Sequence, residues 1–327
     1  MEKKVGNLYW SGDARMRYTA SSLKDKKDAY DGRIRLNVKG QVNDATYVQG
    51  QFVNNMNFKD EASSNTTMAQ IYVNHNFNKN VAVRLGRQPI AFGNQGGWQY
   101  NGLEGYDGAQ VSYNNGKLAL TTGFGQLNAS DLTDDTYTDD EGNVVVESYG
   151  VTGTDMYFAK GAYDFGFAKL GADYVKFQGD TNSTDHYVAG DELYGINLNI
   201  PVQKFNVFGE YWKNTNAADK YDTAWNAGLS YGKADWKKAG TWDLSVAYND
   251  VDYNVYFGGG TWHNDMLKNF TAGYLNAYNL TFWTAIANVT LQKNVQLHAE
   301  YAFAADAEGT CGVDPDDSWT VSLNYKF

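Results

Sequence analysis

Apolar and polar residues alternate without a break along the last eleven residues of the chain, from Asp317 to Phe327. A period of two puts successive side chains on opposite faces of a β-strand. One face here is apolar, and the other carries serine, threonine, asparagine and lysine. The segment is therefore predicted to be a strand between two different environments. Its apolar positions are Trp319, Val321, Leu323, Tyr325 and Phe327.

The same period returns throughout the chain, which predicts many strands of this kind. Two further segments have the composition of strands but lose clean alternation, as β-bulges would cause; they span residues 154–163 and 271–291. The clearly alternating segments span residues 10–18, 32–40, 206–211, 225–231, 242–249 and 295–303.

The connections between these segments are of two kinds, short turns and long polar loops. Alternation of eight long loops with short turns predicts about sixteen strands, an even number as in bacterial barrels, with both termini on the short-turn side. The clearest short turns span residues 77–81, 163–166, 201–204 and 291–295. The long loops span residues 19–30, 57–66, 88–107, 126–153, 177–191, 214–222, 250–270 and 304–316.

The composition can be reconciled with a membrane barrel, which hides its polar half in the lumen. Aromatic residues make up 15% of the 327 residues, yet hydrophobic residues make up only 43%. No stretch approaches the roughly 18–20 apolar residues of a spanning helix, and a closed barrel is the other structure that can span hydrocarbon. No linker divides the chain. We therefore predict an all-β fold, one transmembrane antiparallel β-barrel domain over residues 1–327, with residues 1–7 as a short lead.

Aromatic residues on the apolar faces are spaced as two membrane girdles would be. Three Trp/Tyr pairs are six residues apart, which is about 20 Å along a strand and fits an apolar band about 25 Å tall after strand tilt. The girdle candidates are Trp10, Tyr18, Trp225, Tyr231, Trp242, Tyr248, Trp319, Tyr325 and Phe327.

Charge and sequence ends exclude some functions and leave others open. A net charge of -11 argues against nucleic acid as a partner. The first seven residues lack the apolar segment of a signal peptide, so either that peptide is removed or the chain begins partway through a longer protein. The single cysteine, Cys311, has no partner for an internal disulfide and is expected to be an incidental loop thiol.

Three segments resemble the trimeric general porins of bacterial outer membranes, and the likeness extends over nearly the whole chain. Residues 8–18 match a first strand, residues 83–88 match a fifth, and the terminal strand ends on Phe327. The nearest likeness is to the barrel domain of OmpM-like porins, which carry an S-layer-homology domain ahead of the barrel. This chain has neither that domain nor a coiled-coil stalk. If the likeness holds, those parts precede residue 1 and cell-wall tethering is not a property of this chain.

The resemblance implies a homotrimer integral to the outer membrane, in contact with its lipids and lipopolysaccharide. It also implies a third loop that folds into the lumen and faces a basic wall. Trimer contacts are expected on the small-residue apolar faces near the chain ends, at Gly12, Ala14, Gly32 and Gly40.

The basic residues suit such a wall, because all six arginines lie in the first 87 residues. Guanidiniums opposite carboxylates create a transverse field across a narrow aqueous opening, which disfavours apolar solutes. The alternative is that the arginines solvate the wall or pair with Asp13 and Asp31. Arg87 has the opposite parity from Arg84 and needs a bulge or the end of its strand to turn inward. The candidate pore-lining residues are Arg15, Arg17, Arg33, Arg35, Lys39, Arg84 and Arg87.

The loop from Pro89 to Tyr106 is rich in glycine and aromatic residues and is the candidate inward loop. Its aromatics are expected to pack the loop onto the wall, or alternatively to form a track on which sugars stack. The constriction candidates are Trp98, Tyr100, Glu104 and Asp107.

Motifs for catalysis and metal binding are weak. Residues 228–232 match G-x-S-x-G, but Ser230 falls inside an alternating strand and not in the strand-turn-helix setting of a nucleophile elbow. The four histidines show no metal-ligand spacing: they are His75, His186, His263 and His298. The acidic run from Asp134 to Glu141 misses the EF-hand pattern, although weak divalent-cation binding that bridges to lipopolysaccharide stays open.

The leading hypothesis is a porin, not an enzyme, with no cofactor or resident metal, that passes small hydrophilic solutes and ions by diffusion. One alternative is a channel selective for a sugar or peptide. Two others are an outer-membrane barrel hydrolase that uses Ser230 and a soluble all-β carbohydrate-binding protein. Ion selectivity stays open, because the chain is acidic whereas the expected constriction is basic.

Overall fold

The computed structural model describes residues 3–24, 26–59, 64–94, 97–127, 134–138, 144–148, 155–178, 192–217, 220–255, 263–271, 274–309 and 314–327. These residues form nineteen strands and one short helix. The elements are β1 (Lys3–Val5), β2 (Leu8–Ala20), β3 (Ala29–Asn43), β4 (Thr46–Asn57), β5 (Ser64–Asn76), β6 (Val81–Phe92), β7 (Tyr100–Asn114), β8 (Leu118–Leu127), β9 (Asp134–Thr138), β10 (Val144–Ser148), β11 (Asp155–Asp164), β12 (Lys169–Gln178), β13 (Glu192–Val202), β14 (Phe205–Asn214), β15 (Thr223–Gly232), β16 (Trp242–Asp252), α1 (Met266–Thr271), β17 (Asn279–Gln292), β18 (Val295–Glu308) and β19 (Ser318–Lys326).

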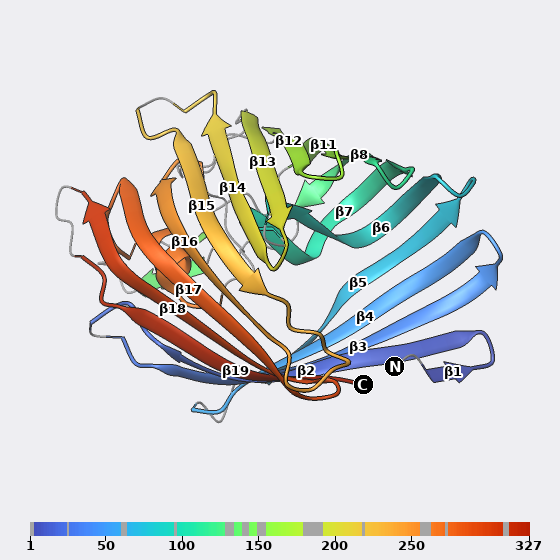
Figure 1. Cartoon of the computed structure of the whole chain (residues 1–327), viewed down its shortest axis with the longest axis horizontal. Helices are drawn as coiled ribbons and strands as arrows, with labels where there is room; N and C mark the ends of the chain where they lie inside the picture. Colours follow the sequence, from blue (N-terminus) through green and yellow to red (C-terminus); the bar gives the residue numbers. More distant parts are fainter. Residues whose placement is uncertain are drawn as a thin grey trace.

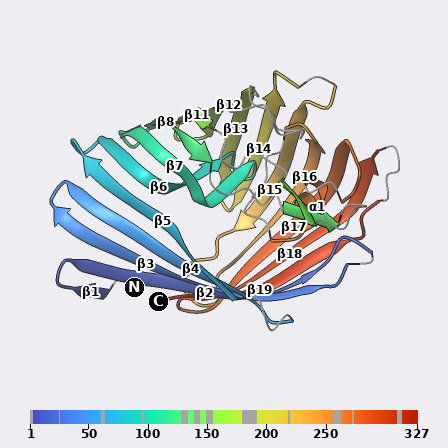
Figure 2. The same cartoon turned by 180° about the vertical axis from the view of Figure 1, so that it is seen from behind.

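Sixteen of the described strands form one closed antiparallel barrel, which confirms the predicted fold (Figures 1 and 2). The ring runs from β2 to β8, continues from β11 to β19, and returns to β2. Leu118 of β8 pairs with Tyr163 of β11, and Ala20 of β2 pairs with Trp319 of β19. Closure leaves no open sheet edge around this ring. The hairpin of β9 and β10 forms a separate two-stranded sheet.

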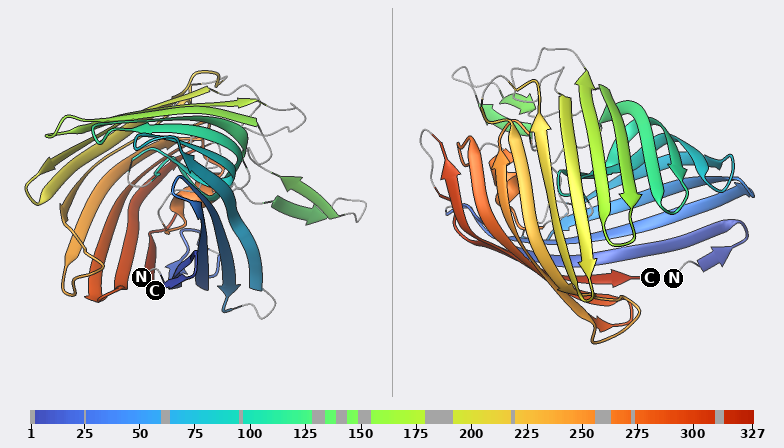
Figure 3. Two further views of the ribbon diagram at one scale, coloured as in Figure 1. Left: turned by 90° about the vertical axis from the view of Figure 1, so that its right-hand side faces the viewer. Right: turned by 45° about the horizontal axis from the view of Figure 1, so that its top comes forward.

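The predicted short turns are confirmed at one end of the barrel. Val202 is followed by two turn residues before Phe205, and Gln292 by two before Val295. Each of these turns contains a residue in the left-handed region, Gln203 with φ 57° and Asn294 with φ 65°. Both chain termini lie near this end (Figure 3), as the alternation of turns and loops predicts.

The other end of the barrel carries the long connections. Three of these contain strands or a helix where a loop is expected: residues 88–107, residues 126–153 with the β9–β10 hairpin, and residues 250–270. Most of residues 88–107 is not a loop, because β6 continues to Phe92 and β7 begins at Tyr100. The expected loop 250–270 contains α1 in its last part. Bulges are confirmed in β17, where the register shifts near Trp283 and again near Gln292. The ladders of β11 are regular, so no bulge explains its weak alternation.

The outer face of the barrel is apolar and exposed. Trp10, Met16 and Ile34 are each more than 40% exposed, a fraction far above that of an ordinary core position. The side chains that alternate with them point to the inner face. Among the described residues, no helix is both long enough and apolar enough to cross a membrane.

The girdle candidates lie on this outer face in contacting pairs. The ring centroids of Tyr18 and Trp319 are 5.0 Å apart, and those of Tyr231 and Trp242 are 5.5 Å apart. Tyr248 contacts both Trp225 and Trp283. Trp10, Tyr325 and Phe327 are exposed on the same face. The sequence analysis missed Trp283, because the bulge beside it breaks the alternation of its strand.

The terminal residue, Phe327, contacts β2 at the seam, where β19 pairs with β2 to close the barrel. The backbone of Phe327 exchanges two hydrogen bonds with that of Gly12, at 2.9 and 3.0 Å. Its ring lies over Gly12, where an added Cβ would be 2.5 Å from the ring and 2.6 Å from the carbonyl oxygen of Arg35. Phe58 covers Gly32 in the same way. The glycines expected to make trimer contacts at these two positions thus contact aromatic rings of their own chain.

A first prediction concerns this seam. Replacing Gly12 with alanine should lower the free energy of unfolding by about 1–3 kcal/mol, because the added methyl overpacks a fixed backbone contact. The measurement is urea-induced unfolding of the refolded barrel in lipid vesicles. Gly50→Ala is the matched control, since the nearest atoms to its added Cβ are backbone oxygens at 4.0 Å. Equal stability of the two variants would contradict the close packing of Phe327.

Candidate functional site

A cluster of arginines and aspartates covers the inner face of β2 and β3. The register places Arg15 opposite Arg33, and it places each aspartate opposite another arginine. Asp31 lies 2.8 Å from Arg17 and 3.6 Å from Arg15. Asp13 lies 2.8 Å from Arg35 and 3.6 Å from Arg33. The pairing weighed as an alternative is therefore present, yet four arginines against two aspartates leave an excess of two positive charges.

Two further basic candidates, Lys39 and Arg84, lie on the inner face, where each contacts an aromatic ring. Lys39 lies over the ring of Tyr47 at 4.4 Å. The guanidinium of Arg84 lies 5.0 Å from the ring of Tyr72, a nearly buried inner-face residue.

Arg87 and Asp107 are placed differently from the prediction. Arg87 shares a strand face with Leu85 and pairs in register with Ile71, both of which are more than 50% exposed. Its guanidinium forms a two-pronged ion pair with Asp107, with nitrogen–oxygen distances of 2.8 and 2.9 Å. No bulge turns Arg87 inward, so this pair lies on the outer face of the wall.

The hairpin of β6 and β7 leaves the wall at its loop end. The ladder between β5 and β6 stops at Arg87, and that between β7 and β8 stops at Tyr106. Beyond these points the two strands pair only with each other. Trp98 and Tyr100 at the tip are fully buried, which supports packing over an open stacking track. Glu104 belongs to β7, but its side chain lies outside the described residues.

Carboxylates on the wall that this tip reaches accept hydrogen bonds from its backbone amides. Glu210 on β14 accepts a hydrogen bond from the Asn94 amide at 2.9 Å and another from the Trp212 indole at 2.9 Å. Asp173 on β12 accepts one from the Gly93 amide at 3.1 Å. The tip is thus attached to the acidic wall at β12–β14, across the ring of strands from the arginines of β2 and β3.

A second segment, residues 263–271 with α1, packs beside the basic wall. Thr320 donates a hydrogen bond to the His263 carbonyl oxygen at 3.0 Å. Asp265 accepts hydrogen bonds from the Ser22 amide at 2.9 Å and from the Ser318 hydroxyl at 3.0 Å. These contacts tie the segment to β19 and to the connection that follows β2. Sequence periodicity gave no sign of this, because the contacts are made by single polar residues.

The two inward segments meet in one apolar cluster. It joins the β6–β7 tip, α1 and the loop ends of the surrounding strands. Gln99 also donates a hydrogen bond to the carbonyl oxygen of Val255, at 2.5 Å. A barrel of this size therefore has its loop half narrowed from two sides. Trp98, Tyr100, Met266 and Phe270 are among the cluster's fully buried members.

The structure shows what surrounds some of the residues in the weak catalytic and metal-binding motifs. Ser230 lies within β15, so the turn and helix of a nucleophile elbow are not beside it. Burial and the neighbouring Arg15 guanidinium hold the pKa of the His263 imidazole well below its usual range, so its ring is neutral near pH 7. His186 and Cys311 lie outside the described residues, as do the side chains of the acidic run around Tyr137.

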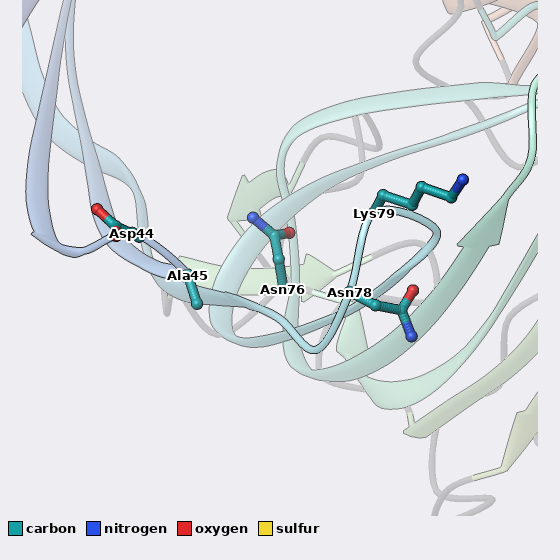
Figure 4. Close-up of a pocket in the computed structure, with 5 residues that line it drawn as sticks. All are labelled: Asp44, Ala45, Asn76, Asn78 and Lys79. Atoms are coloured by element: carbon teal, nitrogen blue, oxygen red, sulfur yellow. The ribbon is translucent and has the colours of Figure 1, made fainter.

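A shallow hollow at the opposite end of the barrel is separate from these features. It is lined by Asp44, Ala45, Asn76, Asn78 and Lys79 from the turns that join β3 to β4 and β5 to β6 (Figure 4). The amide of Asn76 donates a hydrogen bond to the carbonyl oxygen of Ala45, at 2.8 Å. Lys79 points away from Asp44 in Figure 4, so the polar groups do not converge on one point.

A second prediction tests the attachment of the β6–β7 tip. Glu210→Ala should speed hydrogen exchange of the Asn94 amide by about tenfold or more, because the amide loses an acceptor worth about 1–1.5 kcal/mol. The measurement is exchange mass spectrometry on the refolded barrel. Glu192→Ala is the control, since Glu192 binds Lys176 at 2.6 Å and not the tip. Unchanged exchange in Glu210→Ala would show that Glu210 does not hold the tip.

Comparisons with known proteins give the fold a context. No family model matches the chain, and no curated protein matches it. The OprB of Pseudomonas putida, in a high-pH structure, is 11% identical with a TM-score of 0.60, covering 98% of this chain and 94% of that one.

Two further solved structures match over their whole length. The OmpT of Vibrio cholerae, an outer membrane protein in a trimer form, is 11% identical with a TM-score of 0.57, covering 99% of this chain and 100% of that one. A triple mutant of the Rhodopseudomonas blastica porin is 12% identical with a TM-score of 0.57, covering 98% and 100%. At such identities the likeness concerns the fold alone, which is a barrel fold shared with these outer-membrane proteins and porins.

Proposed function

We propose that this protein is a porin of the bacterial outer membrane, in which it forms a water-filled channel for small hydrophilic solutes and ions. The observation that carries the proposal is the division of the closed barrel into an exposed apolar outer face and a charged inner face. A barrel satisfies its backbone hydrogen bonds within hydrocarbon. Its polar inner face can then line a path for solutes.

The constriction of this channel would lie where the two inward segments narrow the lumen. The arginines of β2 and β3 line one side, and their two aspartates offset only part of their charge. Across the barrel, Glu210 and Asp173 are occupied by amides of the β6–β7 tip. The excess charge on the basic wall favours anions over cations of equal size.

The contact between the two inward segments favours a second candidate function, a channel selective for a sugar or peptide. The apolar cluster that the β6–β7 tip shares with α1, together with the hydrogen bond from Gln99 to Val255 just after β16, would restrict the open cross-section. A narrow passage with fixed polar groups can discriminate by solute shape. Saturable block of the single-channel current by one solute class would support selectivity, whereas a current insensitive to all of them would favour the general porin.

A homotrimer is part of the same proposal. The Arg87–Asp107 ion pair lies on the outer face, beside the exposed apolar side chains of Leu85 and Ile71. Charged groups facing lipid are costly at membrane depth, so a neighbouring copy of the chain is a better cover than lipid. The OmpT structure from Vibrio cholerae is described as a trimer form, which agrees with this arrangement.

A third prediction tests assembly. Native mass spectrometry of the refolded protein should give the mass of three chains, and Arg87→Glu should shift the population toward monomers by placing like charges at the interface. Lys117→Glu makes the same charge change at an exposed turn and should leave the trimer intact. A monomer of unaltered protein would refute the trimer without affecting the channel proposal.

A fourth prediction tests the basic wall. Replacing Arg33 and Arg35 together with alanine should shift the reversal potential in a salt gradient toward cations and raise the conductance. The physical reason is the loss of two positive charges and two bulky side chains from the narrowed lumen. The measurement is made in a planar lipid bilayer at low salt, where screening is weakest.

The control for this measurement is the pair Lys237→Ala and Lys238→Ala, which removes the same charge from an exposed turn. We expect its reversal potential to equal that of the unaltered channel. If the arginine variant also equals the unaltered channel in both readouts, the arginines do not line the path. If neither protein conducts, the channel proposal itself fails.

A further inference from the structure

Two histidines and one glutamate converge on the inner face of the barrel beside the arginine wall. His298 and Glu300 project from the same face of β18, two residues apart, and His263 comes from the inward segment before α1. Their ligand atoms all lie within 4.8 Å of one another. Among the residues that the structure describes, this is the one such group of three metal-ligating side chains. Sequence spacing gave no hint of it, because His263 is distant along the chain.

The hydrogen bonds of His298 direct its second ring nitrogen at Glu300. Asn288 donates from its amide nitrogen to Asp243 at 2.7 Å, which turns its amide oxygen toward His298. The Nδ1 atom of His298 lies 2.8 Å from that oxygen and therefore carries the hydrogen. The other ring nitrogen, Nε2, faces the Glu300 Oε1 atom at 2.8 Å. At this distance the two atoms share either a proton or a metal ion.

His263 brings a third ligand atom to the same point. Its Nδ1 atom is buried without a hydrogen-bond partner and lies 3.5 Å from Glu300 Oε1. The two imidazole rings are 5.2 Å apart and nearly perpendicular, at 84°. Three metal-ligating atoms thus face one space, in which the Glu300 side chain has no exposed surface.

The second oxygen of Glu300 is already held in place. Oε2 accepts hydrogen bonds from the backbone amides of His263 and Asn264, at 2.7 and 2.9 Å, and from the Asn264 side chain at 2.9 Å. Oε1 therefore remains directed at the two rings. Metal-binding side chains in proteins are oriented by such outer hydrogen bonds, and a ligating histidine usually donates its other nitrogen to an oxygen. Asn288 and Asn264 supply both features here.

We propose that His263, His298 and Glu300 bind one divalent transition-metal ion, of which Zn²⁺ is the representative. Two imidazoles and one carboxylate with an open fourth position form a zinc-binding set. A tetrahedral site with bonds of 2.0–2.1 Å separates its ligands by about 3.3 Å. The distances of 2.8 and 3.5 Å on Glu300 lie on either side of that value.

The neighbouring arginines set the conditions for this site. Arg15, Arg17 and Arg33 all act electrostatically on His263, and their positive charge weakens the binding of any cation. Asp13 and Asp31 offset part of that charge. The bound ion would fasten the inward segment to β18 and add two positive charges beside the basic wall. Its effect on ion selectivity rests on the proposed channel function, whereas its binding does not.

Zinc binding is tested by titration calorimetry on the refolded barrel, with Zn²⁺ as the probe and Cys311→Ser as the background to remove the thiol. We expect one ion per chain, and about a hundredfold weaker binding in His263→Ala and in His298→Ala. Asn288→Ala should weaken binding by about 10–100-fold through loss of the outer hydrogen bond. His75→Ala and His186→Ala are the matched controls and should bind as the background protein does.

Folding of each variant is checked by its unfolding midpoint in urea, and Glu300→Gln provides a near-isosteric variant should an alanine variant fail to fold. The direct readout is the copper form, whose paramagnetic resonance spectrum should show coupling to two nitrogens, and to one in His298→Ala. Binding that is equal in the background protein and both histidine variants would overturn the site, as would the absence of saturable binding.

A measurement of the reversal potential distinguishes failure of the metal site from failure of the proposed channel function. Zn²⁺ should shift the reversal potential toward anions in the background channel and leave the His298→Ala channel unchanged. A channel that conducts but binds no zinc would refute the metal site and leave the proposed function standing. Zinc binding to a protein that does not conduct would refute the proposed function and leave the site standing.

Discussion

Backbone hydrogen bonding is the constraint on which the rest of this structure depends. In hydrocarbon an unpaired amide or carbonyl has no water to bind, so every barrel strand needs a neighbour on both sides. The ring of sixteen strands meets that demand by joining β19 to β2 and β8 to β11. The contact between Phe327 and Gly12 completes the seam at the turn end. Side chains are thereby free to divide into an apolar outer face and a polar inner one.

The same constraint explains how the lumen accommodates two segments that leave the wall. Their amides are buried away from water, and buried amides need acceptors. Carboxylates on the inner wall serve this purpose. Asp173 and Glu210 accept hydrogen bonds from backbone amides of the β6–β7 tip. Glu300 accepts hydrogen bonds from the backbone amides at the start of the other segment. Asp265 makes the reciprocal contact, accepting the amide of Ser22 in the connection after β2. Carboxylate–amide pairs are thus the recurring means of attachment inside the barrel.

Alternation along the sequence was sufficient to predict the fold but not the interior. Strand parity depends on neighbouring residues, and closure follows from the need to satisfy backbone groups, so the barrel and its turns were accessible. The region around Pro89 was predicted to be a loop because glycine and aromatic residues interrupt its alternation, whereas its two strands pair with each other inside the barrel. Contacts such as Asn94 with Glu210, or His263 with Glu300, join residues far apart in the chain. No local pattern encodes which wall an inward segment reaches.

The sign of the charge along the inner wall also depends more on these contacts than on the net charge of the chain. The chain carries a net charge of -11, yet the carboxylates nearest the lumen are engaged by amides, an indole or arginines. Asp13 and Asp31 each serve two arginines, so they cannot neutralise all four. An excess of positive charge therefore persists within an acidic protein. Because partly buried charges are screened less than exposed ones, this excess acts with little screening along the wall of β2 and β3.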